Sequence, residues 1–512
     1  MPTDIPAPSI AYGPLTPLLV VFGAATLAVL VEAFVPAARR RTVQIALACV
    51  ALAAAAVDAG VLAGTGRLVA QGAVAVDGPA LFLQAAIAVL GLGGILLLSE
   101  RSLDGSGGAV VSRAALRPGS REDVALAESV EIQTEVYPLA LFALGGMMLF
   151  PACNNLLLMF VALEVLSLPL YLMAGLARRR RLLSQEAAVK YFLLGAFSSA
   201  FFLYGVAMIY GYAGTVDISA VFTATGLAGT NDVLLYLGIA MLAIGLLFKI
   251  GAVPFQAWTP DVYQGSPTPV TALMASCTKL AGFGALLRVF YVAFGPDRWD
   301  WRPMMWVIAI LTMVGGAVLA VTQTDVKRML AYSAVAHTGF LLVGVVALNR
   351  DGLAGSLFYL VTYGFTTMAS FALVGLVRDS SGEATHLAQW TGLGRRSPLV
   401  AGVFALFLFA LAGIPLTSGF MAKFAVFKAG VEGGATGLVV VGVLASAITA
   451  FFYARVVVLM FFNEPASDAP TVALPSGYTA VVIAVGLAVT VVLGVLPQPL
   501  LDLANRAAVF VR

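Results

Sequence analysis

Long apolar runs decide what this chain can fold into. About fourteen runs of roughly twenty residues follow one another, each long enough for an α-helix to cross the hydrocarbon core of a membrane. Hydrophobic residues make up 61% of the 512 residues and charged residues only 11%, which is far from the composition of soluble domains. The sequence therefore predicts an all-α polytopic membrane protein.

The expected spans lie near residues 13–36, 43–65, 78–99, 136–152, 154–176, 184–212, 232–257, 266–294, 302–322, 326–348, 352–378, 398–430, 434–462 and 476–497. One long polar connection, residues 100–135, separates the first three spans from the others and has the alternating charges of a solvated loop.

Basic residues gather in every second connection. "AARRR" follows the first span, "ARRRR" follows the fifth, and Lys327 and Arg328 follow the ninth, whereas the even-numbered connections hold only Arg67, Arg298, Arg302 and Arg350. Because Lys and Arg resist translocation, the odd-numbered connections should face the cytoplasm. Both termini are then expected on the outer face.

Two stretches recur five helices apart. "YFLLGAFSSAF" from Tyr191 resembles "YLVTYGFTTMASF" from Tyr359, and "KIGAVP", which ends at Pro254, resembles "ALAGIP", which ends at Pro415. Since five is odd, the two copies should be inverted in the membrane, an arrangement that places discontinuous helices near the midplane. Each copy should contain one helix that is broken at its proline.

This pattern predicts four parts. Residues 1–135 hold three leading helices and a cytoplasmic loop, 136–294 the first five-helix repeat, 295–462 the inverted second repeat, and 463–512 the last transmembrane helix and a tail.

A few ionisable residues lie deep in the apolar spans, where a charge costs several kcal/mol. They are Glu164, Lys249, Lys279 and Lys423, with Lys190 less deeply placed. One glutamate could form a structural ion pair with one lysine but not with three, so the set indicates function. By contrast, Glu32, Asp58, Arg288, Lys428 and Arg455 stand near span ends and are expected to reach the membrane interface.

Glu164 is expected to pair with Lys249, because a nearby carboxylate changes how strongly a buried lysine holds its proton. Lys279 and Lys423 would extend this array into the second copy, with His337, Tyr332 and Ser333 available between them. We call Glu164, Lys249, Lys279, His337 and Lys423 the buried-charge line. A line of groups that exchange protons suits proton transfer across a membrane.

Other kinds of site find little support. The three cysteines have no CxxC spacing, two histidines are too few for a pair of haems, and no G-x-x-x-x-G-K-[ST] motif occurs. We therefore expect no metal or cofactor site in this chain. A net charge of +3 that is spread over many connections also argues against nucleic acid as a partner.

Three long motifs bear a family resemblance: "VPFQAWTPDVYQGSPTPVTALMASCTKLAGF", "TQTDVKRMLAYSAVAHTGF" and "AGIPLTSGFMAKF". They resemble the antiporter-like subunits of bacterial respiratory complex I, the proton-pumping NADH:quinone oxidoreductase. The resemblance is strongest to the N-type subunits, since the L and M types usually have histidines around the seventh and eighth helices and M has a glutamate at the place of Lys423. One departure is Gln256, where N-type relatives often have histidine.

The resemblance implies a subunit of the bacterial cell membrane that translocates protons through Glu164, Lys190, Lys249, Lys279 and Lys423. It also implies that NADH, FMN, iron–sulfur clusters and quinone are bound by other subunits. The implied partners are the sister subunit M, the small subunits K and J, and membrane lipid.

Two other functions compete with this interpretation. Mrp-type cation/proton antiporters and membrane-bound hydrogenase relatives share the fold and its lysines, and a scaffold that pumps nothing would also fit the hydropathy. No pair of acids near the midplane could hold Na⁺, which disfavours a sodium carrier.

Overall fold

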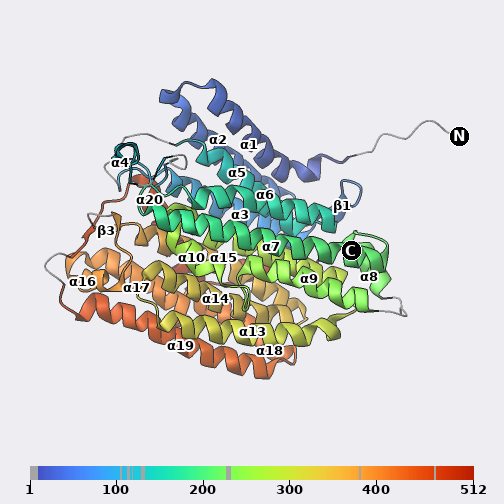
Figure 1. The fold of residues 1–512 in the computed structure, drawn as a ribbon. Helices are drawn as coiled ribbons and strands as arrows, with labels where there is room; N and C mark the ends of the chain where they lie inside the picture. Colours follow the sequence, from blue (N-terminus) through green and yellow to red (C-terminus); the bar gives the residue numbers. More distant parts are fainter. Residues whose placement is uncertain are drawn as a thin grey trace.

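The computed structural model describes residues 10–103, 107–111, 116–117, 119–128, 133–226, 232–379, 382–465 and 469–511. Over these residues it contains twelve helices that are long and apolar enough to cross a membrane, and two shorter apolar helices, Val136–Ala152 and Pro398–Ala412. The number of spans expected from the hydropathy is confirmed. The helices lie side by side in one bundle (Figure 1).

The helices of the first half are α1 (Thr16–Phe34), α2 (Ala37–Val61), α3 (Gly78–Leu98), α4 (Arg121–Glu128), α5 (Val136–Leu149), α6 (Leu156–Ala174), α7 (Arg181–Ala213), α8 (Ile218–Thr225), α9 (Val233–Ile250), α10 (Trp258–Gly265), α11 (Thr268–Leu273) and α12 (Lys279–Arg288). Those of the second half are α13 (Arg298–Val321), α14 (Val326–Val346), α15 (Arg350–Val374), α16 (Leu393–Arg396), α17 (Pro398–Ala412), α18 (Ser418–Glu432), α19 (Thr436–Phe462), α20 (Gly477–Val495) and α21 (Gln498–Ala507).

The structure is not purely helical. Short strands lie in the connections: β1 (Arg67–Val69) pairs with β2 (Val74–Val76), and β3 (Val377–Asp379) pairs with both β4 (Gly382–Glu383) and β5 (Thr471–Val472). All of these strands have two or three residues. They close turns and do not form a layer of the core.

The connections divide between two opposite ends of the bundle. In Figure 1, α4, β3 and α16 lie at the left end, whereas β1, α8 and the C-terminus lie at the right end. The left end collects the odd-numbered, basic connections that are expected to be cytoplasmic. We call it the basic end, and the other the β1 end.

Both predicted broken helices are present. The chain leaves α9 at Ile250 through Gly251, which has φ +74°, and resumes as α10 at Trp258. Likewise it leaves α17 at Ala412 through Gly413, which has φ +85°, and resumes as α18 at Ser418. Pro254 and Pro415 lie within these two gaps, where an absent backbone N–H interrupts no helical hydrogen bond.

The expectation that Arg288 reaches the membrane interface is wrong. Its side chain is completely buried and forms an ion pair of 2.7 Å with Asp77 at the start of α3. Arg288 Nε also donates to the carbonyl of Pro151 at 2.6 Å. A buried cation needs such partners, and these come from residues far away in the sequence.

The long connection 100–135 is only partly a solvated loop. Val110 and Val111 are buried, and the Val111 amide donates to the carbonyl of Leu176 at 2.8 Å. Glu100 is also buried, at 5% exposure, beside the first turn of α20. Its Oε2 accepts hydrogen bonds from the Ser476 amide at 3.0 Å and from the Thr479 hydroxyl at 2.6 Å.

Glu100 thus satisfies free donors at the N-terminus of a helix almost 400 positions away, where a negative charge is favourable. Burial by itself raises the pKa of this carboxyl, but the hydroxyls of Ser476, Thr479 and Ser102 outweigh burial and lower the pKa to about 2.

The charge of Glu100 should therefore stabilise the position of the α20 N-terminus in the bundle. We expect Glu100→Gln to lower the temperature at which the assembled protein unfolds in detergent. The pKa of the Glu100 carboxyl is depressed from 4.5. The unfolding temperatures of the variant and the wild type should therefore differ fully above about pH 5, and the difference should disappear as the pH falls toward 2. Thermal unfolding of both proteins between about pH 2 and pH 8 measures this difference in unfolding temperature.

Glu122→Gln is the matched control, because Glu122 is an exposed carboxylate in the first turn of α4. An equal loss of thermal stability in both variants would contradict the role assigned to Glu100.

Candidate functional site

Three lysines of the predicted site lie deep in the protein. Lys249, Lys279 and Lys423 are 3%, 4% and 5% exposed. Within the part of the chain that the structure describes, none of the three forms an ion pair. Their partners are hydroxyls and backbone carbonyls.

Lys249 lies in the last turn of α9, one residue before the helix ends. Its Nζ donates to the hydroxyls of Ser167 at 2.8 Å and of Tyr191 at 3.3 Å, and it lies 5.5 Å from the centre of the Tyr191 ring. The end of a helix is partly negative, so this position favours a cation.

The predicted direct pair between Glu164 and Lys249 is absent from the structure. Glu164 lies on α6, one turn before Ser167. Its Oε1 is buried without a hydrogen-bond partner. The Ser167 hydroxyl, which sequence reasoning missed, takes the direct place beside the lysine.

Lys279 begins α12 and reaches across to α14. Its Nζ donates to the carbonyl of Ala334 at 2.5 Å and to the hydroxyl of Thr338 at 2.8 Å. Thr338 in turn donates to the carbonyl of Ile250 at 2.8 Å, at the broken end of α9. A single threonine thus connects Lys279 to the break that follows Lys249.

Lys423 lies on α18 and reaches back across the second break. Its Nζ donates to the carbonyl of Ala412, the last residue of α17, and to the hydroxyl of Ser446, both at 2.8 Å. Gly413 makes room for the lysine, because an added Cβ there would lie 2.9 Å from Lys423 Cδ. The break and the lysine therefore depend on each other.

The three lysines share one bonding pattern. Each ammonium has two oxygen acceptors, which satisfy the two N–H donors of a neutral amine. The third proton of the charged form has an aromatic face nearby, at 5.5, 5.0 and 4.7 Å from the ring centres of Tyr191, Tyr363 and Phe340. Both protonation states can therefore be accommodated.

His337 lies between Lys279 and Lys423. Its ring is 5.0 Å from that of Tyr363, which is next to Lys279, and 5.7 Å from that of Phe340, which is next to Lys423. Its Nδ1 is 2.7 Å from the hydroxyl of Tyr359. The structure thus brings His337 to the predicted place.

Other predicted members lie elsewhere. Lys190 is 40% exposed and forms ion pairs of 2.6 Å with both Glu186 and Asp261, so it is not a buried, unpaired cation. Ser333 is hydrogen-bonded to the Tyr453 hydroxyl, and the ring of Tyr332 faces Arg328. Neither hydroxyl is bonded to a lysine of the line.

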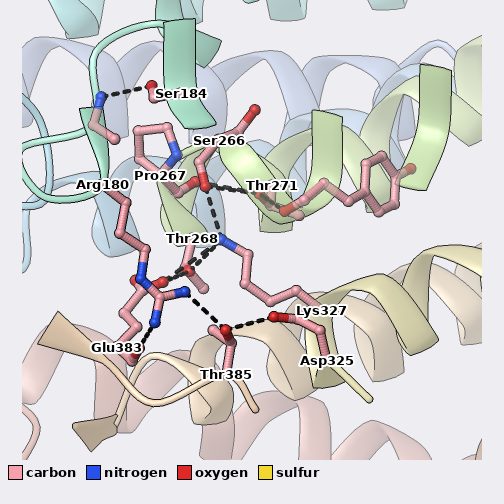
Figure 2. Close-up of polar contacts among 12 residues, drawn as sticks. Arg180, Ser184, Ser266, Pro267, Thr268, Thr271, Asp325, Lys327, Glu383 and Thr385 are labelled. Atoms are coloured by element: carbon pink, nitrogen blue, oxygen red, sulfur yellow. Dashed lines mark hydrogen bonds and ion pairs between the residues drawn. The ribbon is translucent and has the colours of Figure 1, made fainter. Parts of the chain in front are cut away.

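A second polar cluster lies at the basic end. Figure 2 shows Lys327 pointing into the gap between α10 and α11, where its Nζ donates to the Ser266 carbonyl at 2.8 Å and to Thr268 at 3.0 Å. Glu383 on β4 is 3.5 Å from this Nζ and accepts from Thr268 at 2.5 Å. Lys327 is 2% exposed, so this basic residue of an odd-numbered connection is buried inside the protein.

This cluster also binds Arg180, which donates to the Glu383 carbonyl and to Thr385 (Figure 2). Burial raises the pKa of the Glu383 carboxyl, but Lys327 and Thr268 outweigh burial and keep the pKa below its ordinary value. Glu383 is therefore charged at neutral pH. The segment from α11 to α12 is thus fastened to α14 twice, through Lys327 and through Lys279.

Gln256 lies in the first break, and its Oε1 is buried without a hydrogen-bond partner. Over the described ranges, no group of three or more His, Cys, Asp or Glu side chains could hold a metal ion.

A helical bundle with two broken helices and a buried lysine close to each break defines an antiporter-like membrane protein. Residues 153–449 match the family model described as NADH:quinone oxidoreductase/Mrp antiporter, TM. The chain is 62% identical to NADH-quinone oxidoreductase subunit N of Parafrankia sp. (strain EAN1pec), over 98% of this chain and 96% of that protein. It belongs to the NADH-quinone oxidoreductase subunit N family.

Solved structures agree with this membership. A chain of respiratory complex I from Thermus thermophilus with bound aureothin is 32% identical with a TM-score of 0.76, covering 96% of this chain and 99% of that one. A chain of the Mrp complex from Dietzia sp. DQ12-45-1b has a TM-score of 0.80 at 23% identity, covering 96% and 97%. The Mrp likeness is one of fold alone.

The contact between Gly413 and Lys423 can be tested directly. We expect Gly413→Ala to displace the Lys423 side chain, and a displacement near 1 Å of a functional side chain can cost about tenfold or more in turnover. The measurement is NADH:quinone oxidoreductase turnover of the assembled complex in membrane vesicles.

Gly434→Ala is the matched control, since Gly434 has φ +74° but an added Cβ would meet no atom within 4 Å. It imposes the same left-handed strain of about 1–2 kcal/mol without touching a lysine. Equal losses in the two variants would assign the effect to backbone strain alone.

Proposed function

We propose that this chain translocates protons across the bacterial cell membrane along the buried-charge line, driven by NADH oxidation and quinone reduction in other subunits. The bonding of Lys249, Lys279 and Lys423 carries the proposal. Each lysine has acceptors for a neutral amine and an aromatic face for the charged form, so each can bind and release a proton without unfolding its surroundings.

The order of the groups supports transfer within the membrane plane. Lys249 and Lys279 are connected through the Ile250 carbonyl and Thr338, and His337 lies between Lys279 and Lys423. Glu164, one turn before Ser167 on α6, would act on Lys249 from a distance, and the hydroxyl of Ser167 lies directly beside the lysine. A charge that moves at one lysine changes the electrostatic energy of the next.

Lys190 takes a peripheral part in this proposal. Asp261 holds it at 2.6 Å and also pairs with Arg328, so the three charges join α7, α10 and α14. Lys190 would hold α10 in place beside the first break.

The remaining assignments rest on family membership. NADH, FMN, iron–sulfur clusters and quinone would be bound by other subunits, with no redox site in this chain. The neighbouring subunits would be the sister subunit M and the small subunits K and J, within membrane lipid. The gathering of basic connections at one end supports a cytoplasmic basic end and both termini on the outer face.

We also propose the two inverted five-helix repeats, residues 136–294 and 295–462, as functional halves. Each contains one broken helix with a left-handed glycine at the break, Gly251 or Gly413, and one buried lysine on that helix, Lys249 or Lys423. The three leading helices and the C-terminal part flank these halves.

A lysine that carries protons should tolerate another titratable group better than an inert one. We expect Lys423→Met to abolish coupled turnover, a loss of about a hundredfold or more. Lys423→Glu should retain part of it, because a carboxyl can still bind and release a proton. NADH-driven acidification of membrane vesicles per electron transferred is the measurement.

Lys428→Met is the control on the same helix, since Lys428 is 58% exposed and pairs with Glu432 at 3.7 Å. Its pumping should be normal. Normal pumping by the Lys423→Met complex would remove Lys423 from the pathway.

Glu164 should set the charge state of Lys249. We expect Glu164→Gln to leave assembly intact and to lower proton pumping by about tenfold, because the amide keeps the shape but removes the charge that favours a protonated lysine. Quinone reductase activity coupled to pumping measures the effect, with Glu432→Gln as an exposed control. Full activity in an assembled Glu164→Gln complex would refute this role.

A further inference from the structure

A large apolar groove lies at the β1 end, away from the buried-charge line. Its volume is about 650 Å³, and α2, α3, α15 and α21 form its walls. Small residues line much of it, among them Gly60, Ala85 and Ala86, with Phe365 and Leu503 on the facing helices. Side chains of the chain itself leave it open, because a Cβ added at Gly60 would meet no atom within 4 Å.

The depth of the groove matches one leaflet of a membrane. Along α3 its lining extends from Gly78 at the helix start to Val89. At 1.5 Å per residue this is about 16 Å, and half of the hydrocarbon core is about 15 Å. An extended acyl chain in the leaflet at the β1 end would run along this wall.

The mouth of the groove is basic, on a face of the protein that is otherwise poor in cations. Arg506 on α21 lines it, and Arg67 is the neighbour of the lining residue Gly66. Arg350, at the start of α15, donates to the carbonyl of Asn505 at 2.8 Å, next to Arg506. Two of the four arginines in the even-numbered connections therefore stand at this mouth.

Nearby acids cancel these charges only in part. Asp77 lines the groove, but Arg288 engages it in the buried ion pair of 2.7 Å. Asp351, beside Arg350, and Asp502, one turn before Arg506, keep their charges, so Arg67, Arg350 and Arg506 leave the mouth with one net positive charge. Arg506 is exposed, so its guanidinium can reach a ligand at the membrane surface.

α21 has the pattern of a helix that lies in the membrane interface. Its apolar residues, Leu500, Leu501, Leu503, Ala504 and Ala507, alternate at helical spacing with polar ones, and it packs against α15 and α3. α21 therefore covers the end of the groove at the level of lipid headgroups.

We propose that this groove binds one anionic phospholipid of the leaflet at the β1 end, with an acyl chain between α2, α3 and α15 and the phosphate beside Arg506. Arg67 and Arg350 add positive charge around the headgroup, which attracts anionic lipids over zwitterionic ones. This site is independent of the proposed proton pathway. The lipid fills a groove that small side chains leave open.

The test uses the whole complex, purified in mild detergent, with its retained phospholipids counted by native mass spectrometry. Gly60→Leu places a side chain into the groove and should remove one anionic phospholipid per complex. Gly402→Leu is the matched control, because Gly402 is also exposed and an added Cβ there meets no atom within 4 Å. It should retain the wild-type number.

A second measurement addresses the headgroup. The delipidated complex is incubated with phosphatidylglycerol or phosphatidylcholine micelles, and Arg506→Gln should lower the preference for phosphatidylglycerol by about tenfold, the effect of one lost charge-assisted contact. Equal lipid retention by Gly60→Leu and Gly402→Leu would overturn the site. A segment of another subunit in the groove, in a map of the complex, would overturn it as well, and an unchanged preference in Arg506→Gln would refute the phosphate contact.

Discussion

Free backbone carbonyls at broken helices are the constraint on which this structure depends. In hydrocarbon no water can satisfy the carbonyls at the end of a helix, so a break in mid-membrane requires donors from within the protein. Lys423 supplies one to Ala412, and Thr338 supplies one to Ile250 while it accepts from Lys279. Each break therefore creates a place for a polar donor. Lys423 fills one such place directly and Lys279 contacts the donor that fills the other, whereas Lys249 lies beside the first break and donates to side-chain hydroxyls.

This mutual dependence explains why the three lysines form no direct ion pairs in the part of the chain that the structure describes. An ion pair would hold a lysine in its charged form, whereas carbonyls, hydroxyls and aromatic faces bind the amine and the ammonium with smaller differences in free energy. Ser167, Tyr191 and Ser446 serve in this way. Ion pairs in the same protein, such as Asp77 with Arg288, hold helices together and lie away from the line. The two kinds of buried charge thus have different surroundings and different uses.

The two halves of the chain are fastened by polar contacts at the basic end as well as by apolar packing. Lys327, on α14, binds the Ser266 carbonyl in the gap between α10 and α11, and Glu383 closes the contact from β4. Because α14 also bears Ala334 and Thr338, the same helix determines where Lys279 lies. A shift of α14 would therefore change the contacts of Lys327 at the basic end and those of Lys279 in the buried-charge line together.

The sequence by itself determined the features that depend on local chemistry. Apolar length predicted the spans, the two prolines predicted the broken helices, and hydropathy identified Lys249, Lys279 and Lys423 as buried. Only the tertiary structure decided which groups meet: Ser167 rather than Glu164 beside Lys249, Asp77 beside Arg288, and Ser266 beside a buried Lys327. The physical reason is that helices which are apolar on every side give no signal for the face that packs inward, so rotation and neighbours follow from close packing of the whole bundle.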